Sequence, residues 1–204
     1  SPVIFQLGKK AKADYDAVVS GAKQAIKNSL AAKKPANALA EIERLKQAAA
    51  VAKLPACIEW INDFIDTGEK LVVFATHKFV IDALMAEYGN IAVKVDGSVT
   101  GEERQKSVDR FQNDESVKLF IGNIQAAGVG ITLTAASNVC FLEYAWSPGD
   151  MAQSADRVHR IGQKNAVTIF YLAGEKTIDE DIVALLEEKR KVIDTIHDGK
   201  VGDM

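Results

Sequence analysis

The chain has 204 residues, of which 48% are hydrophobic and 26% charged, enough for one large domain or for a domain with an appendage. Its net charge of −3 excludes a protein that binds nucleic acid through bulk charge, so any such contact must come from a local basic patch. Two cysteines are too few for a disulfide framework or a zinc site.

The first fifty residues are rich in alanine and lysine, and their apolar residues recur at helical spacing on both sides of Pro35. This pattern predicts two helices joined around residues 33–37, which make residues 1–53 a helical segment. Pro55 suits the first turn of a further helix, which Gly68 would end. The chain opens on Ser1 without a methionine, which suggests a segment of a longer protein.

Residues 54–204 show a different pattern, with short apolar runs that alternate with helical stretches. The runs predict strands at 71–76, 91–95, 118–123, 138–143 and 167–173. Helices are predicted at 79–88, 101–111 and 150–161, and a last one at 178–196. This alternation predicts an α/β fold, a parallel sheet with helices on both faces, and functional residues at the carboxyl ends of the strands. No signal peptide and no apolar run of about 18 residues is found, which predicts an intracellular protein without a membrane span.

Polar residues follow the first two predicted strands. His77 and Lys78, after Thr76, fit either contacts to a sugar–phosphate backbone or a solvated loop. Ser98 and the helix start behind it suit a nucleic-acid phosphate, although simple chain reversal explains the residues before it. Arg104 lies in a first helical turn, where the helix dipole does not favour a cation, so a carboxylate or a bound phosphate would compensate it.

The stretch from Gln153 to Gln163, QSADRVHRIGQ, carries two arginines three positions apart. If it is helical, Arg157 and Arg160 lie on one face, one turn apart. Guanidinium groups bind phosphate oxygens in pairs, so this face suits a polyphosphate whose charge is neutralised during transfer. Alone, such a pair is better explained by surface ion pairs on a solvated helix.

Gly128 and Gly130 stand in the apolar stretch AAGVGITLTAA, where exposed N–H groups could cradle an anion. A tight turn with close packing explains two spaced glycines equally well and is the better explanation of them alone. The sequence has no G-x-x-x-x-G-K-[ST] phosphate loop, and Asp179–Asp181 are interpreted as charge at a helix start, so no metal ligands are predicted. An arginine pair without a phosphate loop or a magnesium site indicates half of an active site.

Four ordered motifs, VVFATH, VDGSVTGEERQKSVDRF, AAGVGITLTAA and QSADRVHRIGQ, resemble the second RecA-like lobe of a Swi/Snf-family, superfamily-two DNA translocase. The similarity runs from about Leu54 to about Ile196, and the D-R-x-H-R-I-G-Q signature is highly specific. The first fifty residues resemble, more weakly, the helical segment that projects between the two lobes in this family. The resemblance implies a RecA-like parallel sheet preceded by this helical segment.

The resemblance also implies a DNA-dependent ATPase that tracks along duplex DNA. ATP with Mg²⁺ would lie between two lobes, and the first lobe would hold the phosphate loop and most of the magnesium ligands. Carried over residue by residue, Arg160 becomes the arginine finger and Arg157 its partner. The remaining carried-over residues are Gln153 and Asp156 beside the arginines, Gly128 and Gly130 at the nucleotide, and Thr76, His77, Lys78, Ser98 and Arg104 along the DNA groove.

The expected partners are double-stranded DNA and the first lobe of the same polypeptide, in the nucleoid of a prokaryote or the nucleus of a eukaryote. Alone, the chain is expected to be monomeric and inactive in ATP hydrolysis. The alternative is a non-catalytic module of the same fold that binds DNA or protein. Residues 125–127, Gln-Ala-Ala, replace a basic residue and paired glycines of many relatives, which puts one phosphate contact in doubt.

Overall fold

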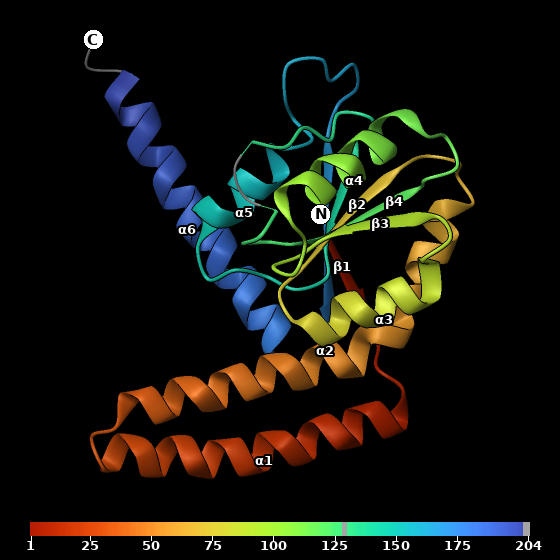
Figure 1. The fold of residues 1–204 in the computed structure, drawn as a ribbon. Coiled ribbons are helices and arrows are strands. Elements are labelled where there is room, and N and C mark those ends of the chain that lie inside the picture. The colour runs from red at the N-terminus through yellow and green to blue at the C-terminus, as the bar shows by residue number, and fades with distance from the viewer. Residues whose placement is uncertain (128–129, 202–204) are drawn as a thin grey trace.

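The computed structural model describes the backbone of residues 1–127 and 130–201, with side chains up to residue 196 (Figure 1). Its described residues form one six-stranded parallel sheet in the spatial order β1-β6-β5-β2-β4-β3. The strands are β1 (Pro2–Phe5), β2 (Leu71–Ala75), β3 (Ala92–Val95), β4 (Leu119–Asn123), β5 (Asn138–Phe141) and β6 (Thr168–Gly174). The predicted parallel α/β sheet is confirmed, with boundaries within two residues for the five predicted strands.

Six helices are found in the described part of the chain. They are α1 (Lys9–Ala31), α2 (Pro35–Ile65), α3 (Lys78–Tyr88), α4 (Gly101–Asn113), α5 (Pro148–Ala155) and α6 (Ile178–Val201). Apolar residues of α4, α5 and α6 pack on one face of the sheet, against Phe74, Phe120 and Phe141 among others. Residues of α2 and α3 cover the other face. Both faces of the sheet are therefore buried, which explains why its strands are continuous apolar runs.

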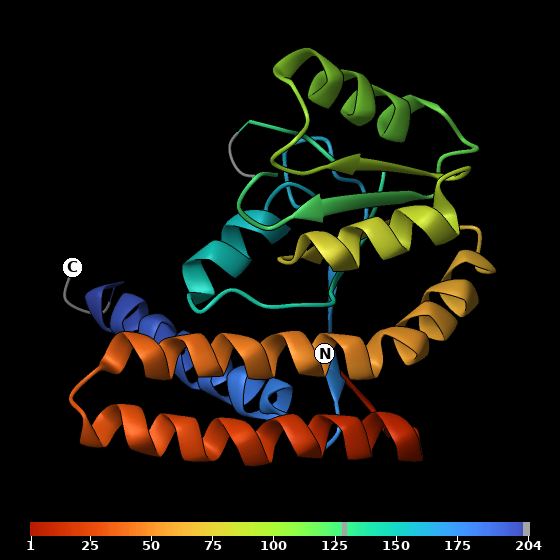
Figure 2. The ribbon, with the colours of Figure 1, turned by 60° about the horizontal axis from the view of Figure 1, so that its bottom comes forward.

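The helix predicted to begin at Pro55 is wrong, because α2 is one helix from Pro35 to Ile65 with Pro55 inside it. A proline in a helix removes one backbone hydrogen bond and bends the axis. Figure 2 shows the last part of α2 turning toward the sheet. The carbonyl four positions earlier belongs to Val51, whose side chain is exposed, so water can reach this turn of the helix. The predicted boundary between residues 53 and 54 consequently falls inside one helix.

The helices α1 and α2 form an antiparallel hairpin, which we call the hairpin throughout (Figures 1 and 2). The hairpin packs α1 against α2 through Tyr15, Ala49 and Ala52. Its attachment to the sheet includes a buried ion pair between Lys53 Nζ and Asp179 Oδ2, 2.8 Å apart, and Lys53 also donates to the carbonyl of Leu172 at 2.8 Å. The edge strand β1 was not predicted from the sequence; it pairs with β6 in parallel and extends the sheet. Among the described residues, no helix is long and apolar enough to cross a membrane.

Candidate functional site

The polar residues predicted at strand ends do gather at one edge of the sheet. Because β5, β2, β4 and β3 are neighbours and parallel, their carboxyl ends lie side by side. Asn123 at the end of β4 donates from Nδ2 to the carbonyl of Thr76 at 2.9 Å, and its Oδ1 accepts from the amides of Gln125 and Ala126. The loops after β2 and β4 are therefore held to each other by the Asn123 side chain.

The carboxylate of Glu143, which follows β5, anchors the loop after β2. Glu143 Oε1 accepts from the backbone amides of Thr76 at 3.0 Å and His77 at 2.9 Å. Glu143 Oε2 accepts from Thr76 Oγ1 at 3.0 Å and contacts His77 Nδ1 closely. The side chain of Glu143 is only 4% exposed. Glu143 was not predicted as a site residue because it lies within an apolar run, although a carboxylate there is itself an unusual signal.

The second ring nitrogen of His77 contacts the hairpin, since Nε2 lies 2.5 Å from Glu43 Oε1 on α2. Both ring nitrogens thus face carboxylate oxygens, and only the protonated imidazolium can donate to both. The hydrogen bond to Glu143 raises the pKa of His77 above its ordinary value of 6.5, against the opposite effect of burial. Burial alone would raise the pKa of Glu143, but hydrogen bonds from His77 and Thr76 outweigh it and lower the pKa from its ordinary 4.5.

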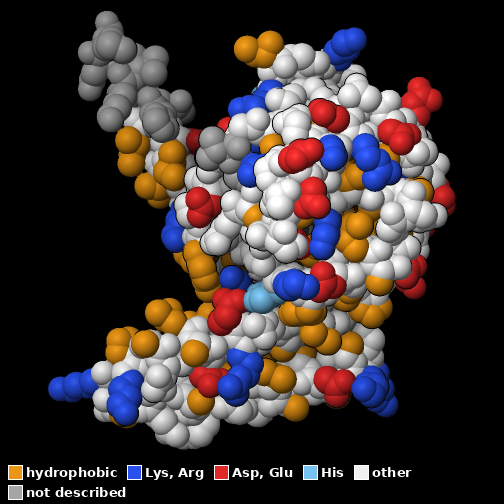
Figure 3. All heavy atoms as spheres, in the orientation of Figure 1, with side chains coloured by type: hydrophobic (Ala, Val, Ile, Leu, Met, Phe, Trp, Pro, Cys, Tyr) orange, Lys and Arg blue, Asp and Glu red, His pale blue; other side chains and the backbone are white. Residues whose placement is uncertain are grey.

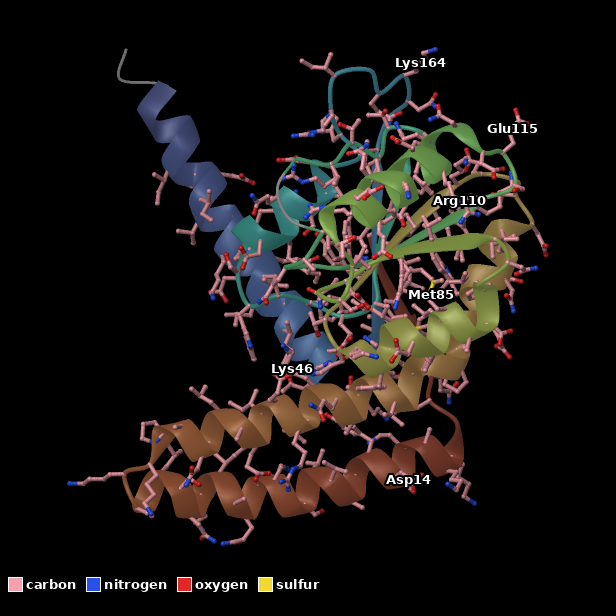
Figure 4. All side chains as sticks on the ribbon, viewed as in Figure 1. Asp14, Lys46, Met85, Arg110, Glu115 and Lys164 are labelled. Carbon is pink, nitrogen blue, oxygen red and sulfur yellow. The ribbon has the colours of Figure 1, made fainter. Side chains whose placement is uncertain are left out.

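Lys46 makes a second contact between the hairpin and the strand-end loops. Its ammonium lies 4.8 Å from the centre of the Trp146 ring, in the loop after β5, and 3.7 Å from Glu43 Oε2. Figure 4 labels Lys46 on the side of α2 that faces the sheet. A cation over an indole ring is a favourable contact, so the middle of α2 is fixed to the edge that carries the candidate site.

The other residues predicted along a DNA groove are spread along the same edge. Lys78 is exposed and forms an ion pair with Asp82 at 2.6 Å. Ser98, after β3, donates from its amide and its hydroxyl to Asp96 Oδ1, and these hydrogen bonds lower the pKa of Asp96. Arg104 is half-buried on α4, behind the capping box that Thr100 and Glu103 form. The positive charge of Arg104 acts on Arg157 and contributes to lowering the pKa of Arg157.

The helix predicted at 150–161 is wrong in its second half, because α5 ends at Ala155. Arg157 and Arg160 therefore lie in a turn and not on a helix face. The carbonyl of Arg157 accepts from the amide of Leu133 at 2.8 Å, so it is engaged with a distant loop. The Gln163 side chain donates to the carbonyls of Thr134, Ala136 and Val158. Gly162, at a φ of 101°, takes a conformation that other residues rarely adopt.

The two arginines nevertheless face a common space, which we call the arginine hollow. It is open, has a volume of about 650 Å³, and is lined by Thr132, Asp156, Arg157, His159, Arg160 and Ile161. Arg160 Nη1 donates to the carbonyl of Ile131 at 2.8 Å and to Thr132 Oγ1 at 3.2 Å. Within the described residues these are its side-chain hydrogen bonds, so Nη2 and Nε stay available to a ligand.

Arg157 is the less satisfied of the pair. It is only 6% exposed, and its buried Nε has no hydrogen-bond partner in the part of the chain that the structure describes. Burial, and then the positive charges of Arg160 and Arg104, lower the pKa of Arg157. Burying a guanidinium without a partner is unfavourable, so an anion in the hollow would satisfy what the chain itself leaves open. The geometry suits a phosphate group.

The remaining predicted nucleotide residues are only partly located. Gln153 and Asp156 are exposed on α5 and at its end, and Asp156 lines the arginine hollow. Gly130 has a φ of 91°, a left-handed conformation that favours glycine. Gly128 lies outside the described residues. No group of three or more histidine, cysteine or carboxylate side chains suited to a metal ion occurs among the residues described.

A family model described as the helicase conserved C-terminal domain matches residues 52–162, more than half of the chain, including the strand-end loops and the arginine turn. Curated relatives extend the match. The SWI/SNF-related matrix-associated actin-dependent regulator of chromatin subfamily A-like protein 1 of Xenopus tropicalis is 39% identical over 148 residues, 71% of this chain. The chain is a helicase C-terminal lobe of the Swi/Snf family.

This Swi/Snf lobe is also similar to the mouse DNA annealing helicase and endonuclease ZRANB3, at 37% identity over 163 residues and 78% of the chain. The lobe spans only 16% of the Xenopus relative and 15% of the mouse one. Both relatives therefore carry much sequence that has no counterpart here.

Solved structures place the Swi/Snf lobe in the RecA-like fold predicted from its motifs. The Sulfolobus solfataricus SWI2/SNF2 ATPase core in complex with dsDNA matches with a TM-score of 0.77 and 26% identity, over 94% of this chain and 44% of that one. The C-terminal part of the Fun30 ATPase domain matches with a TM-score of 0.60 and 31% identity, over 66% and 45% of the two chains. The first match covers nearly the whole chain and so includes most of the hairpin.

Proposed function

We propose that this chain is one half of the ATPase of a duplex-DNA translocase, and that it supplies Arg160 and Arg157 to ATP bound between it and a first RecA-like lobe. The observation that carries the proposal is the arginine hollow. A buried guanidinium whose Nε has no hydrogen-bond partner among the described residues lies there beside a second guanidinium, whose Nε and Nη2 make no hydrogen bond to those residues, in a space open to solvent. A triphosphate would satisfy both side chains.

The proposed mechanism is electrostatic. Arg160, held at Nη1 by the loop after β4, would direct its remaining donors at the phosphoryl group that is transferred and stabilise the charge that develops there. Arg157 would add a second positive charge, and its burial would strengthen that charge's effect on a bound phosphate. Gln153, Asp156, Gly128 and Gly130 are proposed to position the turn and to line the nucleotide cleft.

Magnesium is proposed to be held mainly outside this chain. Its described residues hold no cluster of metal ligands, so we propose that a Mg²⁺ ion accompanying ATP would be held by the first lobe. The protein would act on chromosomal DNA, in the nucleus of a eukaryote or the nucleoid of a prokaryote. The lobe on its own would be monomeric and would hydrolyse ATP negligibly.

The DNA groove is proposed to follow the carboxyl edge of the sheet. Lys78 and Ser98, which follow β2 and β3, would contact a phosphate backbone there. Thr76 and His77 would shape this groove through their hydrogen bonds to Glu143, in addition to the contact proposed from the sequence. Arg104 is also proposed to contact the DNA backbone, and its positive charge acts on Arg157 as well.

The test is Arg160→Ala in the intact protein that also carries the first lobe. DNA-stimulated ATP hydrolysis is expected to fall by about 10³–10⁵, the range for arginine fingers, while the affinity for ATP changes only a few-fold. Arg160→Lys keeps the charge but not the paired donors and should recover only part of the rate. The matched control is Lys164→Ala, since Lys164 is exposed on the loop between α5 and β6 (Figure 4).

Turnover of Arg160→Ala within about threefold of the parent would remove Arg160 from the reaction. Robust DNA-stimulated ATP hydrolysis by the 204-residue chain alone would contradict the proposal that this chain holds only half of the active site. If the intact protein binds DNA but neither the parent nor any variant hydrolyses ATP, the chain is instead a binding module of the same fold.

A further inference from the structure

The free end of the hairpin has a charge unlike that of the rest of the chain. Residues 17–40 contain four lysines, Lys23, Lys27, Lys33 and Lys34, and no aspartate or glutamate, in a chain whose net charge is −3. All four lysines are exposed. Basic side chains extend into solvent from this end of the hairpin (Figure 3). We call these four residues the lysine tip.

The lysine tip differs from the lysines at the other end of α1. Lys10 and Lys12 form ion pairs with Asp14 and Asp16, at i,i+4 spacing on the same helix. No ion pair involving a lysine of the tip is found among the described residues. Lys23 and Lys27 are themselves at i,i+4 spacing, where two like charges destabilise a helix by about 0.2–0.5 kcal/mol.

Local helix preferences also oppose lysine at the turn of the hairpin. Lys34 is the N-cap residue of α2, makes no capping hydrogen bond, and stands where the helix dipole repels a cation. Lys33 adopts a φ of 57°, in the left-handed region that favours glycine or asparagine. Asparagine would suit both positions better, so lysine is retained at the turn against these local preferences. Such departures are expected at functional sites.

The tip also projects on the side of the sheet where DNA is proposed to bind. The contact between Glu43 and His77 fixes α2 at the carboxyl edge of the strands. From Glu43 the helix continues for nine residues back to Lys34, or about 13 Å beyond that contact. Figures 1 and 2 both show the turn of the hairpin extending past the sheet, as the end of α6 also does. The tip is therefore carried away from the lobe but stays attached to the proposed groove.

We propose that the lysine tip binds the phosphate backbone of duplex DNA, as a contact separate from the groove at the strand ends. This inference rests on the proposed function for the identity of the polyanion. The four lysines span roughly 12 Å along the hairpin, a length over which duplex DNA carries about seven phosphates. Lysine acts as a point charge without base recognition, so the contact is independent of sequence and holds the duplex against the lobe as it moves.

The experiment compares pairs of substitutions that change the net charge equally. Tip pairs Lys23→Gln/Lys27→Gln and Lys33→Gln/Lys34→Gln are matched by the control pair Lys10→Gln/Lys12→Gln at the other end of α1. Affinity of the 204-residue chain for a labelled duplex of about 30 base pairs is measured without nucleotide, by fluorescence anisotropy between about 50 and 200 mM salt. Each tip pair should reduce the slope of log K against log salt by about 1.8, and the control pair by much less.

If the tip and control pairs lower the slope of log K against log salt equally, only the net charge matters, and the proposal is overturned. Unchanged slopes in both tip pairs would make the lysines a solvated surface and overturn it as well. If the tip pairs lose binding to phosphatidylserine-containing vesicles or to polyglutamate but not to DNA, the partner is a membrane or an acidic protein. ATP hydrolysis plays no part in this measurement, so its outcome is separate from that of the arginine assignment.

Discussion

Two charged clusters of the lobe differ in how their polar groups are satisfied. In the first, the Glu143 carboxylate accepts from two backbone amides, from the Thr76 hydroxyl and from the His77 ring. In the second, Arg157 is nearly as buried as Glu143, yet its Nε has no hydrogen-bond partner in the described residues. Both clusters contain a buried charged side chain, so burial alone does not distinguish them.

What separates the clusters is whether the chain itself supplies the partners. The Glu143 cluster is complete, which is the arrangement expected of a structural junction between two loops and the hairpin. The arginine cluster is incomplete, which is the arrangement expected of a site that awaits an anion. Substitutions should therefore change stability at the first cluster and turnover at the second.

The largest effect on stability is expected from Glu143→Ala. It would leave the amides of Thr76 and His77 without an acceptor and the His77 ring without its main partner, and each buried donor left unpaired costs about 1–3 kcal/mol. We expect a loss of about 3 kcal/mol or more in the free energy of unfolding, measured by urea denaturation. Glu143→Gln keeps one acceptor oxygen and should lose about half as much. Equal stability of the parent and Glu143→Ala would mean that the junction is not structural.

A smaller effect of opposite sign is expected from Arg157→Met, which replaces a buried guanidinium by an apolar chain of similar length. Removing an unpaired buried charge should leave stability unchanged or raise it by about 1 kcal/mol. In the intact protein, DNA-stimulated ATP hydrolysis should fall at least about 100-fold. Urea denaturation and steady-state turnover measure the two effects. A clear loss of stability with normal turnover would instead show that Arg157 stabilises the fold and takes no part in ATP hydrolysis.

The smallest effect is expected in the pH dependence of the Glu143 cluster. The pKa of His77 is raised, so its contribution to stability is complete below its ordinary value of 6.5 and is lost as pH rises through the folded-state value. The pKa of Glu143 is lowered, so its contribution is present above 4.5 and is lost at lower pH. The difference in unfolding free energy between the parent and His77→Gln should therefore be largest near pH 5–6 and shrink by pH 9. A constant difference across this range would show that His77 is not protonated in the folded chain.

The sheet could be predicted from the sequence because strands buried on both faces are continuous apolar runs. β1 could not, because it is a four-residue edge strand that begins with proline and alternates between exposed and half-buried residues. The continuity of α2 was also hidden, since Pro55 predicts a helix start equally well as a bend. Only the packing of Cys57 and Ile61 on the sheet, after that bend, distinguishes the two.

The residue types of the candidate site could be predicted from the sequence, but their backbone conformation could not. The spacing of Arg157 and Arg160 fits a helix and a turn alike, and the hydrogen bond from Leu133 that ends the helix comes from a distant loop. Local periodicity carries no information about such a partner. The roles of Glu143 and Glu43 were likewise out of reach, because they depend on which side chains the folded sheet brings to His77.

The buried pair of Lys53 and Asp179 has a consequence for how the chain is made. Lys53 reaches the carbonyl of Leu172, 119 residues later, and Tyr15 accepts from the amide of Ile178, 163 residues later. During synthesis the hairpin leaves the ribosome well before the strand and the helix start that fasten it. Lys53 cannot meet its carboxylate until residue 179 has been made. The hairpin is therefore locked in place only after the sheet that follows it in the chain has been made.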